Sequence, residues 1–150
     1  MIVAIGSDHA GFHVKNRLRD LLLADGYEVH DLGATSAEPS DYPDYAAAVG
    51  RAVAAAEAER GVLVCGTGVG MAIAANKVPG VRAAAVSETV SARLSREHNN
   101  ANVVCIGERI VGPEVADDIV RVFLRTAFSH GERHARRVGK IGALETACGS

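Results

Sequence analysis

The chain has 150 residues, of which 48% are hydrophobic and only 4% aromatic, and its formal net charge is −2. This length suits one domain with a sizeable core, built mainly from Ala, Val, Ile and Leu side chains. The near-neutral charge argues against a general nucleic-acid binder or a membrane-surface protein, and no apolar run approaches the roughly 20 residues that a membrane span needs.

Apolar and alternating runs predict five strands, and helical periodicity predicts helices between them. Strands are expected at residues 1–6, 27–32, 62–65, 81–86 and 103–106, and helices at 12–24, 44–60, 71–77, 87–98 and 113–130, before a basic segment at 132–146. Residues 33–43, which include two prolines, are expected to form a loop. Ser87 is expected to cap its helix, with Val90 and Leu94 facing inward, and Val115 is expected on an apolar stripe.

Strands that alternate with helices predict the fold class. The pattern indicates a Rossmann-like (flavodoxin-like) three-layer sandwich, with a five-stranded parallel sheet and helices on both faces, as a single domain over residues 1–150. Ligands of such sheets bind beyond the carboxyl ends of the strands. Asp8 and His9 follow the first strand and Cys65 ends the third, so we expect these side chains to meet at one edge.

The stretch GVLVCGTGVGMAIAANK at 61–77 is expected to form a strand, a glycine loop and a helix. Gly66, Gly68 and Gly70 permit a sharp turn and leave backbone N–H groups uncovered at a helix start, which favours negative charge. A thiol at this position ionises more readily than an ordinary one, so Cys65 is a candidate base or nucleophile. The alternative is a structural cysteine that ends a buried strand before a tight turn.

Other site types fit these motifs less well. The glycine spacing differs from the dinucleotide-binding fingerprint, and no Gly-Lys-Ser/Thr follows as in a P-loop. His9 and His13 have a spacing that can share a metal on a helix, but the helix is expected to start near Gly11 and the sequence shows no convincing third ligand. We therefore expect no metal and no nucleotide cofactor.

Two features near the end of the chain carry positive charge. His98 ends a predicted helix, where an imidazole is able to titrate near neutral pH or to serve only as a C-terminal cap. Arg133 and Arg137 are four residues apart and share one helical face. Two guanidinium groups so placed would hold a phosphate well, although a solvated helix face explains the same pattern.

The three cysteines, Cys65, Cys105 and Cys148, are too widely spaced for a disulfide framework or a zinc site. The N-terminus lacks the basic region and long apolar stretch of a signal peptide. We therefore expect a reduced, soluble, cytoplasmic protein. Cys105 is expected to lie inside a buried strand, and Cys148 near the C-terminus is expected to be exposed.

Taken together, these segments resemble type B ribose-5-phosphate isomerases and the related galactose-6-phosphate isomerase subunits over almost the whole chain. The motifs that carry the resemblance are GSDHAGF at 6–12, DYP at 41–43, CGTGVG at 65–70, AANK at 74–77, SREHN at 95–99 and GERHxxR at 131–137. The order of CGTGVG and AANK, with DHAG before and HNN after, is highly specific.

The resemblance implies an aldose–ketose isomerase that moves a proton between C2 and C1 of a sugar phosphate through a cis-enediolate, without a cofactor. It implies Cys65 as general base, supported by Thr67, and His98 as the group that opens the furanose ring. One branch of the family has a glutamate base where this chain has Met71, so the chain belongs with the cysteine-base branch. The substrate-binding residues implied are Asp8, His9, Tyr42, Gly66, Gly68, Val69, Gly70, Asn99, Arg109, Arg133 and Arg137.

The family also implies a homodimer with shared active sites, or a dimer of dimers, in which residues 132–150 reach the partner subunit. Ribose 5-phosphate is the expected substrate. Allose 6-phosphate, galactose 6-phosphate or a tetrose phosphate remain alternatives within the family. A sugar-phosphate-binding or nucleotide-binding protein without catalysis is the alternative from another class, and it would need only the glycines and arginines.

Overall fold

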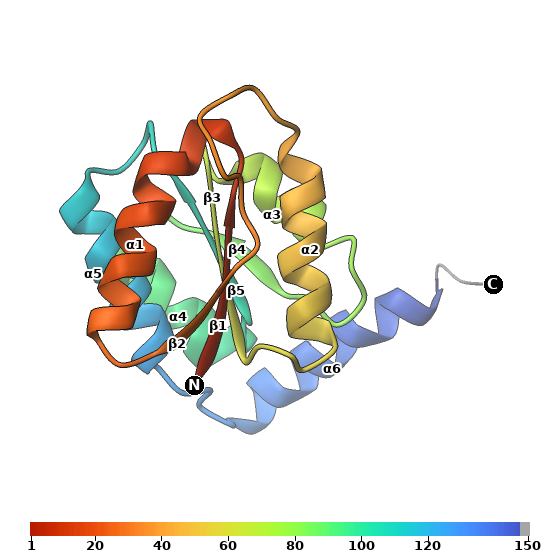
Figure 1. Cartoon of the computed structure of the whole chain (residues 1–150). Coiled ribbons are helices and arrows are strands. Elements are labelled where there is room, and N and C mark those ends of the chain that lie inside the picture. Colours follow the sequence, from red (N-terminus) through yellow and green to blue (C-terminus); the bar gives the residue numbers. More distant parts are fainter. Residues whose placement is uncertain (148–150) are drawn as a thin grey trace.

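The computed structural model describes residues 1–147. Its sheet consists of five parallel strands in the order β2-β1-β3-β5-β4. The strands are β1 (Ile2–Ser7), β2 (Glu28–Asp31), β3 (Arg60–Cys65), β4 (Ala83–Ala85) and β5 (Val103–Gly107). Helices cover both faces of the sheet (Figure 1), which confirms the predicted fold class. The last two strands are exchanged relative to the 2-1-3-4-5 order of flavodoxin.

Six α-helices and one short 3-10 turn complete the described chain. They are η1 (His9–Gly11), α1 (Phe12–Ala24), α2 (Tyr42–Ala54), α3 (Val69–Ala75), α4 (Thr89–Asn99), α5 (Pro113–Arg125) and α6 (Glu132–Ala147). Within residues 1–147, no helix is long and apolar enough to cross a membrane.

Successive side chains along the strands point to opposite faces of the sheet and pack into two hydrophobic cores, one on each face. Val3 and Ile5 of β1 pack with α1, α4 and α5, whereas Ala4 of the same strand packs with α2 and α3. Cys65 and Cys105 both belong to the second core. Their strands are buried on both faces, as the near-continuous apolar runs predict.

The connections create a switch point between β1 and β3. The chain leaves β1 through α1 toward β2, then returns through α2 on the opposite face to β3. The register aligns the ends of the central strands, because Ser7 pairs with Val64 and Cys65 with Gly107. A crevice beyond the carboxyl ends of two such strands is where this architecture binds ligands. We call this end of the sheet the carboxyl edge and the other the amino edge.

The structure corrects several predicted boundaries. Helix α2 ends at Ala54 rather than residue 60, because Ala56 adopts a left-handed conformation (φ 58°) and turns the chain toward β3. Helix α5 ends at Arg125 rather than 130, where the extended Thr126 presents its carbonyl to the Arg96 guanidinium. Strand β4 has three residues rather than six, since it pairs on one side only.

The predicted cap and inward-facing residues of α4 also need correction. Glu88, not Ser87, caps the helix, because its carboxylate accepts hydrogen bonds from the backbone N–H groups of Val90 and Ser91. Val90 is 55% exposed, and on α5 Val115 is 43% exposed, so neither faces the core. Leu94 is half-buried. Cys148, predicted to be exposed, lies outside the described residues.

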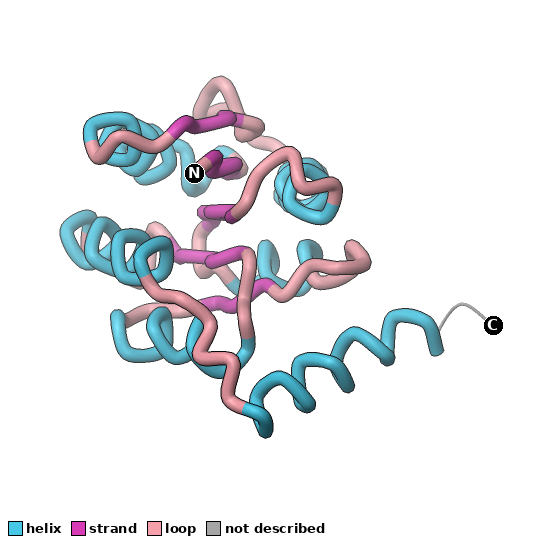
Figure 2. Tube along the Cα trace, turned by 90° about the horizontal axis from the view of Figure 1, so that it is seen from below, coloured by secondary structure: helices cyan, strands magenta, loops and turns pink. Residues whose placement is uncertain are grey.

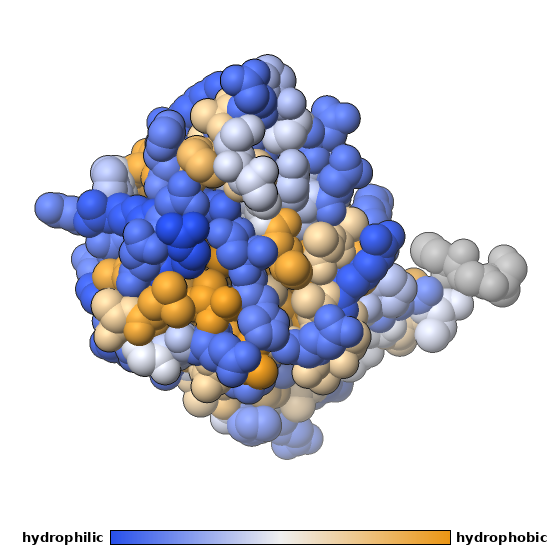
Figure 3. Space-filling view, in the orientation of Figure 1, coloured by the Kyte–Doolittle hydropathy of each residue, from blue (hydrophilic) through white to orange (hydrophobic). Residues whose placement is uncertain are grey.

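Helix α6 leaves the body at the amino edge and runs outward (Figure 2). None of its side chains is buried, and Ile141 and Leu144 are 41% and 66% exposed. On the side of the molecule seen in Figure 1, the surface is mostly hydrophilic and apolar side chains form small groups (Figure 3). Further large exposed apolar side chains lie on α3, where Val69 and Ile73 face solvent.

Candidate active site

Asp8 and His9 stand immediately beyond β1, next to the end of β3. Asp8 is 5% exposed, and its Oδ1 accepts a hydrogen bond from the Gly11 N–H at 3.1 Å, which closes η1. A Cβ at Gly11 would come within 2.5 Å of the Val64 carbonyl oxygen. Only glycine therefore lets the Asp8–His9 turn lie flat against β3.

His9 is held by the loop at residues 33–41. Its backbone N–H donates to Ser40 Oγ at 3.1 Å, and the Ser40 N–H donates to His9 Nδ1 at 3.1 Å. The second ring nitrogen, Nε2, has no partner among the described residues. His13 is exposed and its ring lies 5.4 Å from that of Phe12, so the geometry gives no support to a metal shared with His9.

Cys65 ends β3 and is 5% exposed. The Gly68 N–H donates to its sulfur at 3.1 Å, and the Val69 N–H donates to Thr67 Oγ1 at 3.3 Å. Gly68 has φ +80°, and a Cβ there would meet the Ile106 carbonyl carbon at 3.0 Å. The glycine loop thus directs one backbone N–H, that of Gly68, at the thiol.

Two larger side chains flank this loop. A Cβ at Gly70 would approach the Tyr42 Cζ to 2.7 Å, so the phenol ring lies directly against it. A Cβ at Gly66 would lie 3.4 Å from Arg109 Nη1, which places the guanidinium over the loop. The backbone N–H of Arg109 also donates to the Gly66 carbonyl at 3.0 Å, which fixes the segment after β5. An exposed cation therefore stands over the glycine loop, next to the residue that follows Cys65.

The structure thus gathers one set of predicted residues at the carboxyl edge. Within residues 1–147 no three His, Cys, Asp or Glu side chains are grouped so that they could hold a metal ion. The set combines a thiol, backbone N–H donors, a hydroxyl, an imidazole, a carboxylate and a guanidinium. Its members are Asp8, His9, Tyr42, Cys65, Gly66, Thr67, Gly68, Val69, Gly70 and Arg109.

The remaining predicted residues lie at the opposite edge. His98 and Asn99 end α4 just before β5 begins, and Arg133 and Arg137 are exposed on α6. Five residue steps along β3 separate the two edges by roughly 16 Å. One chain therefore does not bring these four residues to Cys65.

His98 has a close partner that sequence reasoning did not single out. Its ring stacks on that of His134 with centroids 4.3 Å apart and planes inclined by 8°. Burial lowers the pKa of His134, as do the neighbouring His98, Arg133 and Arg137. His134 lies inside the GERHxxR motif, but only the three-dimensional path of α6 across α4 shows its contact.

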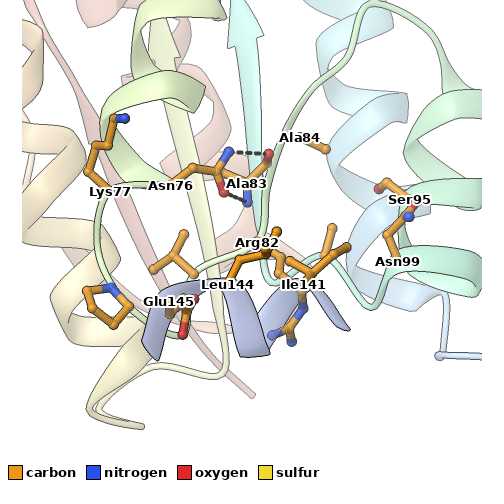
Figure 4. A pocket seen from close by; sticks show the side chains of 13 residues that line it. Asn76, Lys77, Arg82, Ala83, Ala84, Ser95, Asn99, Ile141, Leu144 and Glu145 are labelled. Carbon is orange, nitrogen blue, oxygen red and sulfur yellow. Dashed lines mark hydrogen bonds between the residues drawn. The ribbon is translucent and has the colours of Figure 1, made fainter. Parts of the chain in front are cut away.

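A cavity of about 680 Å³ opens beside this second group, between α6, β4 and α4 (Figure 4). Asn99, Arg82, Ile141 and Leu144 are among the residues that line it. Asn76, from the AANK motif, donates to the Ala83 carbonyl at 2.9 Å and accepts from the Ala83 N–H at 2.8 Å. It thereby closes the free edge of β4.

Comparisons with known proteins show the family of the chain. Residues 3–141 match the family model described as Ribose/Galactose Isomerase. The chain is 48% identical to ribose-5-phosphate isomerase B of Escherichia coli, with 95% of each chain covered. It is 42% identical to a D-erythrulose-4-phosphate isomerase of Pectobacterium atrosepticum, covering 95% of this chain and 94% of the relative. A solved ribose-5-phosphate isomerase B from Clostridium thermocellum superimposes with a TM-score of 0.96 at 50% identity, covering 98% and 99% of the two chains.

Proposed function

Because the chain belongs to the ribose/galactose isomerase family, we propose that this sugar-phosphate isomerase interconverts ribose 5-phosphate and ribulose 5-phosphate, with Cys65 as general base. The observation that carries the proposal is the Cys65 sulfur at the end of β3, within hydrogen-bond distance of a glycine-loop N–H. The relatives named ribose-5-phosphate isomerase B support the substrate.

The proposed chemistry is a proton transfer in two steps. The Cys65 thiolate removes the proton from C2 of the open-chain aldose, and the electron pair forms the C1–C2 double bond of a cis-enediolate. As that double bond forms, the C1 carbonyl π electrons move to O1. A proton then passes from O2 to O1, and the resulting thiol returns a proton to C1 while the C2 carbonyl forms, giving the ketose. Preorganised N–H groups of residues 66–70 stabilise the oxyanion, and a single group serves as base and acid. In this proposal Arg109 and His9 bind the substrate's polar groups.

We further propose that each active site is shared between two chains. His98, Asn99, Arg133 and Arg137 would complete the site of a neighbouring subunit, with His98 assisting ring opening and the two arginines holding the phosphate. The exposed apolar side chains of α6, Ile141 and Leu144, support this proposal. A helix without any buried residue is expected to pack on another surface.

A panel of sugar phosphates tests the substrate. Purified protein should convert ribose 5-phosphate with the highest kcat/KM among tetrose, pentose and hexose phosphates. A higher value for D-erythrulose 4-phosphate, allose 6-phosphate or galactose 6-phosphate would reassign the substrate within the family. Binding of these compounds without turnover of any would instead indicate a non-catalytic sugar-phosphate-binding protein.

A complementation experiment tests the shared site. In a verified heterodimer of a Cys65→Ala chain and an Arg137→Ala chain, a shared arrangement yields one site with both residues intact and one with neither. Activity should therefore rise from near zero in each parent to about half of wild type per dimer. If each chain completes its own site, every site lacks one residue and no activity returns.

A further inference from the structure

The hydrogen bonds around His9 determine which of its ring nitrogens carries hydrogen. A backbone N–H only donates, so the 3.1 Å contact from the Ser40 N–H requires His9 Nδ1 to accept. In a neutral imidazole the hydrogen must then sit on Nε2. The ring cannot gain a proton at Nδ1 without breaking this bond. Ser40 Oγ meanwhile accepts from the His9 backbone N–H, so the two residues hold each other at two points.

Ser40 can impose this geometry because the loop that carries it is fixed at its base. Lys15, only 2% exposed, donates from Nζ to both carboxylate oxygens of Asp31 at 3.0 and 2.9 Å and to the Ala34 carbonyl at 2.9 Å. The Ala34 N–H in turn donates to the Ser7 carbonyl at 2.8 Å. The loop therefore starts as a continuation of the β1–β2 pairing, and it ends where α2 begins.

We propose that Ser40 is a positioning residue that holds His9 as the neutral tautomer with hydrogen on Nε2, so that His9 donates a hydrogen bond to the substrate and takes no part in proton transfer. This inference rests on the proposed function in taking a sugar phosphate as the acceptor. In this proposal the two side chains at the carboxyl edge have separate roles: Cys65 exchanges the proton, and His9 donates a hydrogen bond to an oxygen of the substrate. Ser40 acts only through His9.

The first test reads the tautomer directly and needs no turnover. In uniformly ¹⁵N-labelled protein at neutral pH, long-range ¹H–¹⁵N spectra should show His9 Nδ1 unprotonated and Nε2 protonated. The matched pair of variants is Ser40→Ala and Ser36→Ala, since the Ser36 hydroxyl lies in the same loop but accepts from the Glu38 N–H. Ser40→Ala should broaden or shift the His9 ring signals, and Ser36→Ala should leave them unchanged.

The second test is kinetic. Ser40→Ala removes the hydrogen bond from the His9 backbone N–H to the Ser40 hydroxyl, which helps to hold the His9 Nε2–H donor in place. It should raise KM about fivefold and leave kcat within about twofold, because binding of the ground state and of the transition state is weakened alike. Ser40→Thr, which keeps the hydroxyl, should restore the wild-type KM. His9→Gln keeps an N–H donor near the Nε2 position and should bind substrate about tenfold more tightly than His9→Ala.

Two results would overturn the inference. One is a His9 ring protonated on Nδ1 in the free protein, and the other is a His9→Gln variant as defective in kcat as Cys65→Ala, which would mean that His9 transfers protons. If wild-type protein turns over no sugar phosphate, the proposed function fails, while the His9 ring signals of Ser40→Ala and Ser36→Ala still test the role of the Ser40 hydroxyl: unchanged signals in both variants would overturn it.

Discussion

Replacing Gly68 by alanine should damage both the fold and the proposed active site. Gly68 has φ +80°, a conformation that costs an L-residue roughly 1–2 kcal/mol. The added Cβ would also lie 3.0 Å from the Ile106 carbonyl carbon and 3.2 Å from the Cys105 carbonyl oxygen. These atoms belong to β5, which pairs with strands on both sides and cannot easily move. We expect a loss of about 2–4 kcal/mol in the free energy of unfolding.

The same substitution should lower turnover, because relief of the contact moves the N–H that donates to the Cys65 sulfur. Loss of a single preorganised donor costs roughly a hundredfold or more in kcat. Gly26→Ala is the matched control, since Gly26 also has a left-handed φ (+88°) but has open space at its Cβ position. Urea unfolding and steady-state kinetics of both variants provide the measurement. A Gly68→Ala protein no less stable than Gly26→Ala, with wild-type kcat, would refute this reasoning.

Three further predictions follow from single groups. Lys15→Met should lower the free energy of unfolding by about 2–3 kcal/mol, because the Ala34 carbonyl loses its donor and the Asp31 carboxylate loses its nearest cation. An equal loss in Arg17→Met, whose side chain is 47% exposed, would contradict this. Because the pKa of His134 is lowered, an NMR titration should show His134 gaining its proton below pH ~6.5, and its stack on His98 of α4 should weaken as the pH falls below that value. A midpoint above pH ~6.5 would contradict the lowered pKa. Brief iodoacetamide treatment should label Cys65, and more slowly when sugar phosphate is present. It should not label Cys105, because complete burial raises the pKa of that thiol. Peptide mapping that finds Cys105 labelled as fast as Cys65 would count against this.

The sequence predicted the features that depend on local chemistry. Strand β3 and the loop after it follow from an apolar β-branched run and alternate glycines, and the sheet rule then placed Asp8 and His9 beside Cys65. Helix α1 was predicted at its observed bounds because its apolar spacing is regular and Gly26 lies two positions after its last residue. The strand, loop and helix signals lie within a few residues of one another, and the placement of Asp8 and His9 needed only the general rule for the carboxyl ends of parallel strands.

Features set by distant contacts were not predictable in this way. The stack of His98 on His134 depends on where α6 crosses α4, and the Ser40–His9 bonds join residues 31 positions apart. Ser40 looked like any polar residue in a loop. The strong α-helical propensity of the alanines after Ala54 misled the prediction of α2, since the need to enter β3 ends that helix instead.

The central claim is that Cys65 moves the proton, and isomerisation in D₂O tests it most directly. Wild-type protein with ribose 5-phosphate should form ribulose 5-phosphate and exchange solvent deuterium into the sugar, both followed by NMR. Cys65→Ala should keep its fold and still bind the sugar phosphate, but it should show less than one per cent of wild-type isomerisation and exchange, a barrier increase of roughly 2.7 kcal/mol or more. A folded Cys65→Ala protein that isomerises and exchanges above that level would contradict the account.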